Sequence, residues 1–217
     1  KYFSDWGDRD NKSIPTAAPS LTFECNIKQK DTEQVHFCLG FKGLDQKDQK
    51  LYSFLALNNL LGGGMSSRLF QRVREELGLV YSIYSYPSTY RDVGLMTIYA
   101  GTSASQLERV IETINGELKY LKKNGVTAEE LFRVKEQMKG NFILSMEGTG
   151  SRMSSMGKSE LLLGKIYTQQ ETLDNIDAVN MESLSEMIDR IINFENMAVT
   201  VLGSVDEGIK TIPGMMV

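Results

Sequence analysis

Apolar and polar residues alternate over short stretches of this chain and recur at helical spacing over longer ones. Alternation over residues 21–27 and 33–41 predicts two neighbouring strands, joined by the polar turn at residues 30–32. The run that follows has helical spacing to about Leu61, and Asp45 is placed to cap this helix. The inner face predicted for the helix comprises Leu51, Phe54, Leu55, Asn58 and Leu61.

The second half of the chain predicts a hairpin followed by helices. Residues 79–86 and 93–100 alternate again, and the turn-forming residues between them indicate an antiparallel pair. Four helices follow, and Thr127 with Glu130 forms a capping box at the start of the second one. Their predicted ranges are 105–124, 127–146, 151–163 and 177–194, and the apolar markers of the second are Leu131, Val134, Met138, Phe142 and Leu144.

The end of the chain adds one more strand to this order. Residues 197–203 form a continuous apolar run, which predicts a central strand covered on both faces. Strand pairs are thus mixed with long helices, without regular βαβ alternation. Such an order is typical of an α+β fold, which we expect to be a two-layer sandwich of a mainly antiparallel sheet with helices packed on one face.

Residues 60–86 predict the end of one helix, a triple-glycine joint, a short helix and a strand. Gly62–Gly64 interrupt the apolar periodicity, and Ser66 or Ser67 is placed to cap the short helix. Its inward residues would be Leu69, Val73 and Leu77. Gly78 is placed to end it as the residue after the C-cap. A phosphate-binding loop is excluded because no lysine precedes the serines and no strand precedes the glycines.

This stretch resembles the carboxy-terminal half of the pitrilysin-type (M16) zinc metallopeptidases, which include the mitochondrial processing peptidases. The resemblance is nearly continuous from Asn58 to Ser85 and weaker over most of the chain. It rests on the glycine-rich turn, the Ser-Ser-Arg-Leu-Phe-Gln helix, the Arg-Glu-Glu-Leu-Gly run and the Tyr-Ser-Ile-Tyr-Ser strand. It implies the layered metallohydrolase fold of that family's half-molecule.

The resemblance also implies how the chain is divided. Residues 1–15 would be a linker from a missing amino-terminal half, and residues 16–217 would form the M16-type carboxy-terminal domain. The chain begins at Lys1 without an apolar signal segment, so we expect it to be an excised piece.

Composition excludes several classes of partner. The chain has 217 residues and is 41% hydrophobic, which is enough for a sizeable core. A net charge of −4, with no basic cluster longer than Lys122-Lys123, argues against nucleic acid, and no stretch approaches the length of a membrane span. Cys25 and Cys38 are too few for a disulfide scaffold, so we expect reduced thiols and a cytoplasmic protein; a single disulfide is the alternative.

The chemistry of a complete hydrolase is missing from the chain. A zinc hydrolase needs three protein ligands and a base, and the His-x-x-Glu-His motif alone needs two histidines. This chain has only His36, which lies in an alternating stretch with Cys38 on the same predicted strand face. A metal site with Cys25 is a weaker interpretation than packing within the sheet. A serine nucleophile is no better supported, because Ser155 and Lys158 lack an oxyanion loop.

The resemblance supplies candidate site residues instead. In that family the second half offers an arginine and a tyrosine to the bound peptide, and the matching positions here are Arg74 and Tyr81. Arg72 is the alternative arginine, and it is grouped with the glycine joint, Gly62, Gly63 and Gly64, as a candidate for substrate binding. The competing interpretation of Tyr81 is core packing with its strand neighbours, and that of the arginine is a solvated helix ion pair.

Methionine and tyrosine residues elsewhere are suited to lining a chamber that accepts peptides, although core packing is the commoner role. These residues are Met146, Met153, Met156, Tyr84, Tyr86 and Tyr90.

Together these inferences predict the carboxy-terminal half of a zinc endopeptidase that cleaves peptides or small unfolded proteins. Its partner would be an amino-terminal M16 half, on the same polypeptide or on another subunit, and a homo-oligomer is also compatible. Zinc would be bound by that missing half and not by this chain, which should be inactive alone. The alternative is a non-catalytic structural or partner subunit of the same fold, and a weaker third hypothesis is a self-standing peptide-binding module.

Overall fold

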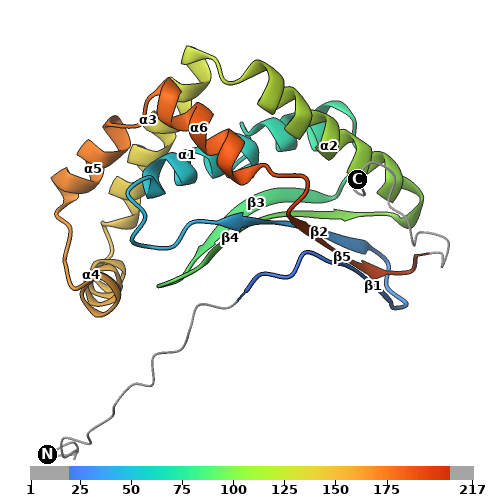
Figure 1. Ribbon diagram of the computed structural model, residues 1–217, viewed down its shortest axis with the longest axis horizontal. Coiled ribbons are helices and arrows are strands. Elements are labelled where there is room, and N and C mark those ends of the chain that lie inside the picture. The colour runs from blue at the N-terminus through green and yellow to red at the C-terminus, as the bar shows by residue number, and fades with distance from the viewer. Residues whose placement is uncertain (1–19, 206–217) are drawn as a thin grey trace, which may run out of the picture.

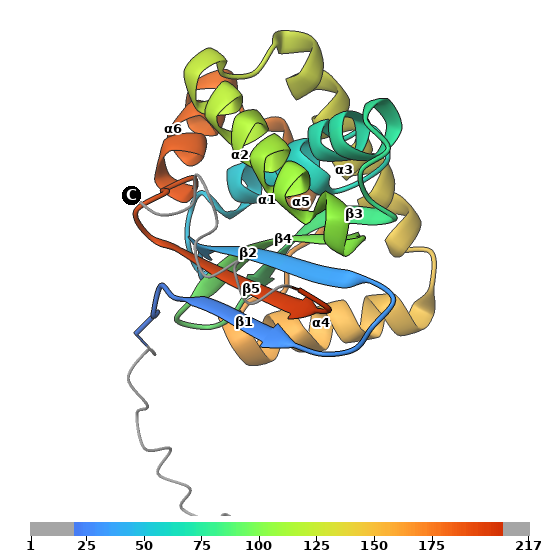
Figure 2. The same cartoon turned by 90° about the vertical axis from the view of Figure 1, so that its right-hand side faces the viewer.

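A sheet of five strands in the order β1-β5-β2-β4-β3 forms one layer of the molecule (Figures 1 and 2). The computed structural model describes residues 20–205. β1 pairs with β5 in parallel, whereas β5 with β2, β2 with β4 and β4 with β3 are antiparallel pairs. The strands are β1 (Cys25–Gln29), β2 (Val35–Gly43), β3 (Ser82–Thr89), β4 (Gly94–Thr102) and β5 (Met197–Gly203).

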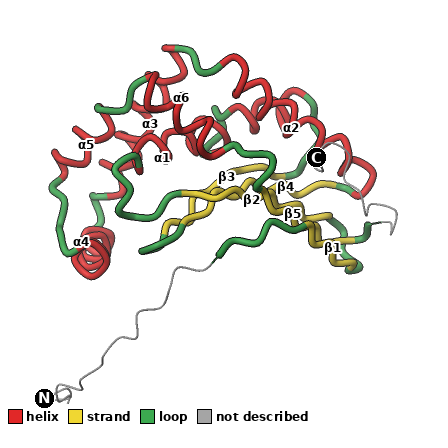
Figure 3. The backbone as a smooth tube through the Cα atoms, viewed as in Figure 1, coloured by secondary structure: helices red, strands yellow, loops and turns green. Residues whose placement is uncertain are grey.

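Helices form the second layer, on one side of the sheet (Figures 1 and 3). They are α1 (Leu51–Gly62), η1 (Phe70–Glu76), η2 (Ala104–Gln106), α2 (Leu107–Asn124), α3 (Ala128–Ser145), α4 (Thr149–Leu163), α5 (Gln169–Asp177) and α6 (Met181–Ile191). α1 contacts β3, α2 contacts β4 and α6 contacts β2. α4 lies apart from the other helices, beyond one end of the sheet, as Figure 1 shows.

The core lies between the two layers. In β2 the side chains of Val35, Phe37, Leu39 and Phe41 are buried, whereas those of the alternating residues are only half-buried. Every inner residue predicted for α2 is also buried, namely Leu107, Val110, Ile111, Ile114, Leu118 and Leu121. The predicted α+β sandwich is therefore confirmed, with a sheet that is mixed because of its one parallel pair.

Two predictions about strands were wrong. β1 and β2 are not neighbours, because β5 lies between them and pairs with both. The loop after β1 spans the width of that inserted strand, and Lys30 N donates to Gly203 O at 3.0 Å on the way. β5 is also not covered on both faces, since Val199 and Val201 are buried but Thr200 is exposed. Ala198 and Leu202 lie on the same face of β5 as Thr200 but are apolar, so the alternation could not be recognised from the sequence.

The start of α1 was also predicted wrongly. Asp45 Oδ1 accepts from Lys47 N at 2.8 Å in the preceding turn, and the helix begins only at Leu51 without a side-chain cap. The helix packs between the sheet and α3, α5 and α6, so its burial extends beyond the predicted stripe. Its buried side chains are Ser53, Phe54, Ala56, Leu57, Leu60 and Leu61, while those of Leu55 and Asn58 are half-buried.

One helix was missed, although a local signal for it exists. α5 begins at a capping box in which Thr168 Oγ1 accepts from Glu171 N and the Glu171 carboxylate accepts from Thr168 N. The Thr-x-x-Glu spacing is visible in the sequence. The predicted box at Thr127 and the predicted cap at Asn180 are both present, but Leu144, expected to face inward on α3, is exposed.

Some predictions lie partly outside the described residues. The whole linker predicted at residues 1–15 lies outside the described residues. Residues 16–19 and 206–217 of the predicted domain also lie outside them. Within residues 20–205, no helix combines the length and the apolar character needed to cross a membrane.

Candidate functional site

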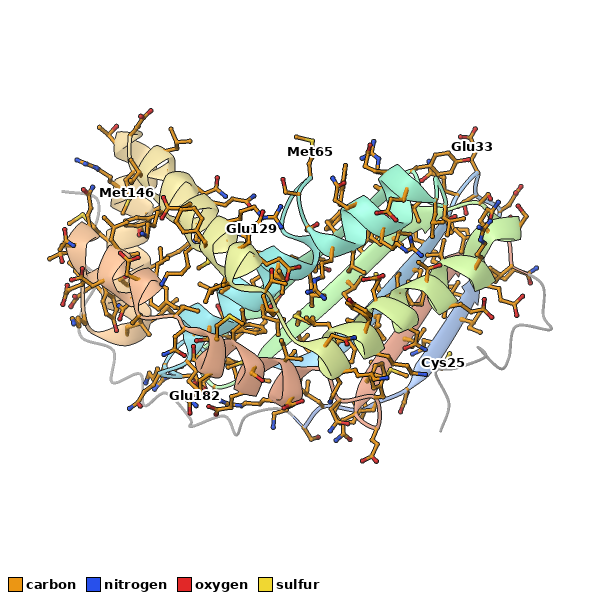
Figure 4. The ribbon with its side chains drawn as sticks, turned by 90° about the horizontal axis from the view of Figure 1, so that it is seen from above. Cys25, Glu33, Met65, Glu129, Met146 and Glu182 are labelled. Carbon is orange, nitrogen blue, oxygen red and sulfur yellow. The ribbon has the colours of Figure 1, made fainter. Side chains whose placement is uncertain are left out.

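The connection between α1 and β3 contains the predicted joint and short helix. α1 ends at Gly62, and the loop after it is closed by Ser67 Oγ donating to Gly64 O at 2.6 Å and by Gln71 Nε2 donating to Met65 O at 2.7 Å. Figure 4 looks down on the helical layer and shows Met65 projecting from this loop, not far from Glu129 at the start of α3. The serine thus closes the loop instead of capping the next helix, because η1 has no side-chain cap.

η1 has π-helical hydrogen bonding over Phe70–Glu76. Such wide turns are rare and occur frequently at functional sites. Leu69 and Val73 are buried as predicted, and Leu77 is half-buried. The helix ends at Gly78, whose φ of +59° is in the left-handed region that favours glycine. Its N–H donates to Arg74 O at 3.1 Å, which fixes the exit of the chain towards β3.

Tyr81 lies in a β-bulge at the start of β3. The N–H of Tyr81 donates to Gly101 O at 2.8 Å, although the register partner of Gly101 is Ser82. Tyr81 and Ser82 therefore both lie opposite the single residue Gly101 of β4. A bulge of this kind redirects a side chain. Leu79 and Ile83 are buried in the core, whereas the Tyr81 side chain is 59% exposed. Core packing therefore does not explain this tyrosine.

The two candidate arginines have different surroundings. Arg72 Nη1 donates to Glu76 at 2.5 Å, and its Nε lies 3.8 Å from Glu117. The hydrogen bond that Arg72 donates to Glu76 raises the pKa of Arg72 above its usual value. Arg74 is exposed, and its guanidinium lies 4.9 Å from the centre of the Phe70 ring. Among residues 20–205 its side chain has no ion pair or hydrogen bond, so its charge is available to a ligand.

The three glycines of the joint have different environments. A Cβ on Gly62 would lie 2.4 Å from Ser85 N, so close packing of α1 on β3 requires glycine there. A Cβ on Gly63 would meet Asn59 Cα at 2.6 Å. At Gly64 the only close atom is the end of the flexible Gln137 side chain, at 2.8 Å. Packing thus accounts for Gly62, whereas Gly63 is exposed and Gly64 is half-buried beside Gln137.

An ion pair that sequence reasoning missed secures this region. Arg68 Nε and Nη2 donate to the two carboxylate oxygens of Glu130, at 2.7 and 2.9 Å, and both side chains are largely buried. Burial alone would raise the pKa of Glu130, but the hydrogen bonds from Arg68 and Thr127 outweigh it and lower that pKa. The capping box predicted Glu130, but nothing local predicted its partner 62 residues earlier.

The residues of this chain do not fit a zinc site. The part of the chain from 20 to 205 contains no group of three histidine, cysteine or acidic residues able to hold a metal ion. His36 Nδ1 shares a 2.8 Å hydrogen bond with the Tyr99 hydroxyl. Cys25 and Cys38 align with Val199 and Thr200 of β5 and so face opposite sides of the sheet. Ser155 and Lys158 are both exposed on α4, away from the joint.

Comparison with known proteins finds a matching family and similar relatives. The family described as the peptidase M16 inactive domain matches residues 1–138. The "Uncharacterized zinc protease YmxG" of Bacillus subtilis is 49% identical over 185 residues, which cover 85% of this chain and 45% of that protein. The "Uncharacterized zinc protease SCO5738" of Streptomyces coelicolor is 41% identical over 155 residues, covering 71% and 34%.

The fold of this chain also matches that of a solved structure. The crystal structure of a peptidase M16 inactive domain from Pseudomonas fluorescens aligns with a TM-score of 0.76 at 21% identity, covering 86% of this chain and 47% of that one. The chain spans less than half the length of these curated relatives and of this solved structure.

Proposed function

This chain belongs to the peptidase M16 family, and we propose that it is the carboxy-terminal half of a zinc-dependent endopeptidase that cleaves peptides or small unfolded proteins. Zinc would be held by an amino-terminal half, because residues 20–205 of this chain contain no group of side chains that fits the metal. Its own contribution would be to bind the peptide and to stabilise charge at the scissile carbonyl, in a cytoplasmic enzyme.

The observation that supports this proposal is the arrangement on either side of Gly78. The turn at Gly78 and the bulge at Tyr81 leave an unpaired guanidinium and a phenol exposed within eight residues of chain. Donors that are fixed before the reaction stabilise negative charge developing on a carbonyl oxygen. In this proposal the Tyr81 hydroxyl donates to that oxygen, and Arg74 provides a positive charge beside the peptide.

A second surface supports the pairing with another half-molecule. Large apolar side chains are exposed along the end of α3, along α4 and in the loop after it, and none of the α4 residues is buried. They are Ile143, Leu144, Met153, Met156, Leu161, Leu162, Ile166 and Tyr167. Exposed apolar surface of this extent marks an interaction site. Because the curated relatives are more than twice as long as the matched region, we assign this surface to the amino-terminal half.

The rival function is a non-catalytic subunit of the same fold. Such a subunit would need the same core and the same apolar surface, but not an exposed Tyr81 together with an Arg74 that forms no ion pair within residues 20–205. The local geometry therefore favours the peptidase.

Reconstitution tests the proposal. The zinc half, this chain and their equimolar mixture would each be incubated with an unstructured peptide, and cleavage followed by mass spectrometry. We expect cleavage by the mixture alone, abolished by a zinc chelator. A mixture that forms a stable complex but never cleaves would support the structural subunit instead, and a fully active zinc half would remove any role for this chain.

A further inference from the structure

Among residues 20–205, no helix packs on the face of the sheet turned away from the helical layer (Figure 1), and we call it the open face. Its side chains alternate with the buried ones, so they are half-buried or exposed. No aspartate or glutamate occurs in any of the five strands, although the whole chain has 28 acidic residues. Two lysines, Lys28 and Lys42, and the single histidine do occur there, aligned with open-face residues. This face therefore differs in charge from the rest of the molecule.

Tyrosines gather on the open face of β3 and β4. Tyr84 and Tyr99 are register partners, and their rings stack with centroids 4.8 Å apart at 29°. The Tyr86 ring lies 6.0 Å from that of Tyr84. These separations are those of favourable aromatic pairs. Tyr84 and Tyr86 are nevertheless 44% and 41% exposed, so ring surface remains for a further partner.

A hydrogen bond to the neighbouring strand β2 fixes one member of the cluster of Tyr84, Tyr86 and Tyr99. The Tyr99 hydroxyl shares a 2.8 Å hydrogen bond with His36 Nδ1 on the adjacent strand. Tyr99 thus has its polar atom satisfied and its ring fixed against Tyr84. A fixed ring loses little entropy when a ligand stacks on the cluster.

The cluster lies next to the strand position that bears Tyr81. A Cβ on Gly101 would lie 3.1 Å from the Tyr99 hydroxyl and 3.0 Å from Ser82 Oγ, so the Tyr99 side chain extends over Gly101. Gly101 O accepts the hydrogen bond from Tyr81 N. A peptide on the open face would therefore pass close to the start of β3.

We propose that Tyr84, Tyr86 and Tyr99 form a subsite for an aromatic side chain of an extended, neutral or acidic peptide. This inference rests on the proposed function and names the class of substrate. Stacking on the exposed rings would select the aromatic side chain. The lysines and the absence of strand carboxylates disfavour basic peptides, because no acidic group on the strands would compensate a cation.

Peptide titration tests the subsite directly. Two blocked, uncleaved peptides of net negative charge would differ only in a central Phe or Lys, and their Kd values for the whole chain and for its complex with the zinc half would be measured by calorimetry. We expect the Phe peptide to bind about fivefold more tightly, the factor typical of one added aromatic pair. Tyr84→Ala should abolish this preference, and Tyr84→Phe should retain it. Tyr90→Ala, which removes an exposed ring beyond the end of β3, should leave the preference unchanged.

Equal binding of the two peptides, or a preference that survives Tyr84→Ala, would overturn the subsite. So would a preference present in the free chain but lost in the complex, because the amino-terminal half would then cover the face. Failure of the proposed function looks different: the reconstituted mixture would not cleave any peptide, while the titration would still report on the tyrosines.

Discussion

The carboxylate of Glu130 receives two parallel hydrogen bonds from the guanidinium of Arg68, at 2.7 and 2.9 Å. The pair joins the start of the η1 segment to the first turn of α3, and it is largely buried. Arg68 Nη2 also donates to Gly125 O at 3.1 Å, so a single side chain fixes two connections. The surface that presents Arg74 therefore depends on a distant ion pair.

Replacing Glu130 by Gln should lower stability and change its pH dependence. Removing one partner of a buried pair leaves a charge uncompensated, which we expect to cost about 3 kcal/mol at neutral pH. The folded pKa of Glu130 is lowered from 4.5, so its contribution is complete above that pH and is lost as the pH falls through the folded pKa. Urea unfolding at a series of acidic pH values should thus show a shallower loss for Glu130→Gln than for the unchanged chain.

The control for that experiment is the neighbouring carboxylate. Glu129→Gln, on the exposed side of the same helix turn, should change stability at neutral pH by no more than about 0.5 kcal/mol. Parallel acid curves for Glu130→Gln and the unchanged chain would show that the ion pair has no part in folding stability.

The glycine joint should tolerate substitution unequally. Gly62→Ala places a Cβ against the Ser85 backbone and should destabilise the fold by about 1–3 kcal/mol. Gly64→Ala meets only a movable side-chain end and should stay within about 1 kcal/mol of the unchanged chain. Thermal unfolding measures both variants, and equal losses at the two positions would refute the packing explanation for Gly62.

The isolated chain should bind no stoichiometric zinc. It has a single histidine, the two cysteines point to opposite faces of the sheet, and residues 20–205 contain no group of three possible ligands. Elemental analysis of the purified, tag-free protein checks this expectation. One tightly bound zinc ion per chain would contradict it.

Cys25 and Cys38 should titrate as two free thiols. β5 separates the strands that contain them, and their side chains lie on opposite faces, which is incompatible with disulfide geometry. Burial raises the pKa of the half-buried Cys38 thiol, so Cys38 should be alkylated more slowly at neutral pH in the folded state than in denaturant. Thiol titration in denaturant without reductant should count two, and a count of zero would refute this assignment.

Local sequence signals predicted most of this fold. The capping boxes and the apolar stripe of α2 involve contacts within a few residues, so both elements were recognisable. The insertion of β5 between β1 and β2 was not, because strand order depends on pairing between residues far apart in the sequence. The cap at Asp45 failed because the same carboxylate can close a turn as well as a helix.

The candidate site was likewise predictable only where its signals are local in the sequence. The helix, Gly78 and strand succession was readable, and family resemblance selected Arg74 and Tyr81. Our preference for Arg74 over Arg72 rests on the positions of Glu76 and Glu117, the second of which belongs to another helix. The redirection of Tyr81 required the register of β3 on β4, which shows the bulge opposite Gly101.

The two arginines provide a matched pair for the reconstituted enzyme. Arg74→Ala should lower kcat for peptide cleavage, because within residues 20–205 the Arg74 guanidinium contacts the Phe70 ring but forms no ion pair that would neutralise its charge. Arg72→Ala breaks an exposed ion pair with Glu76 and a longer, partly exposed one with Glu117, so it should leave turnover nearly intact and cost about 1 kcal/mol of stability or less. Damage from Arg72→Ala alone would move the site to that residue.

Turnover of the Tyr81→Phe variant in the reconstituted enzyme tests the account most directly, because the change removes only the hydroxyl proposed to act on the scissile carbonyl. The side chain is exposed, so the melting temperature should remain within a few degrees. Loss of one pre-placed donor commonly lowers kcat by about 10²–10³. We predict a loss of that size with unchanged assembly of the two halves, whereas full turnover by Tyr81→Phe would contradict the proposed role of this chain in catalysis.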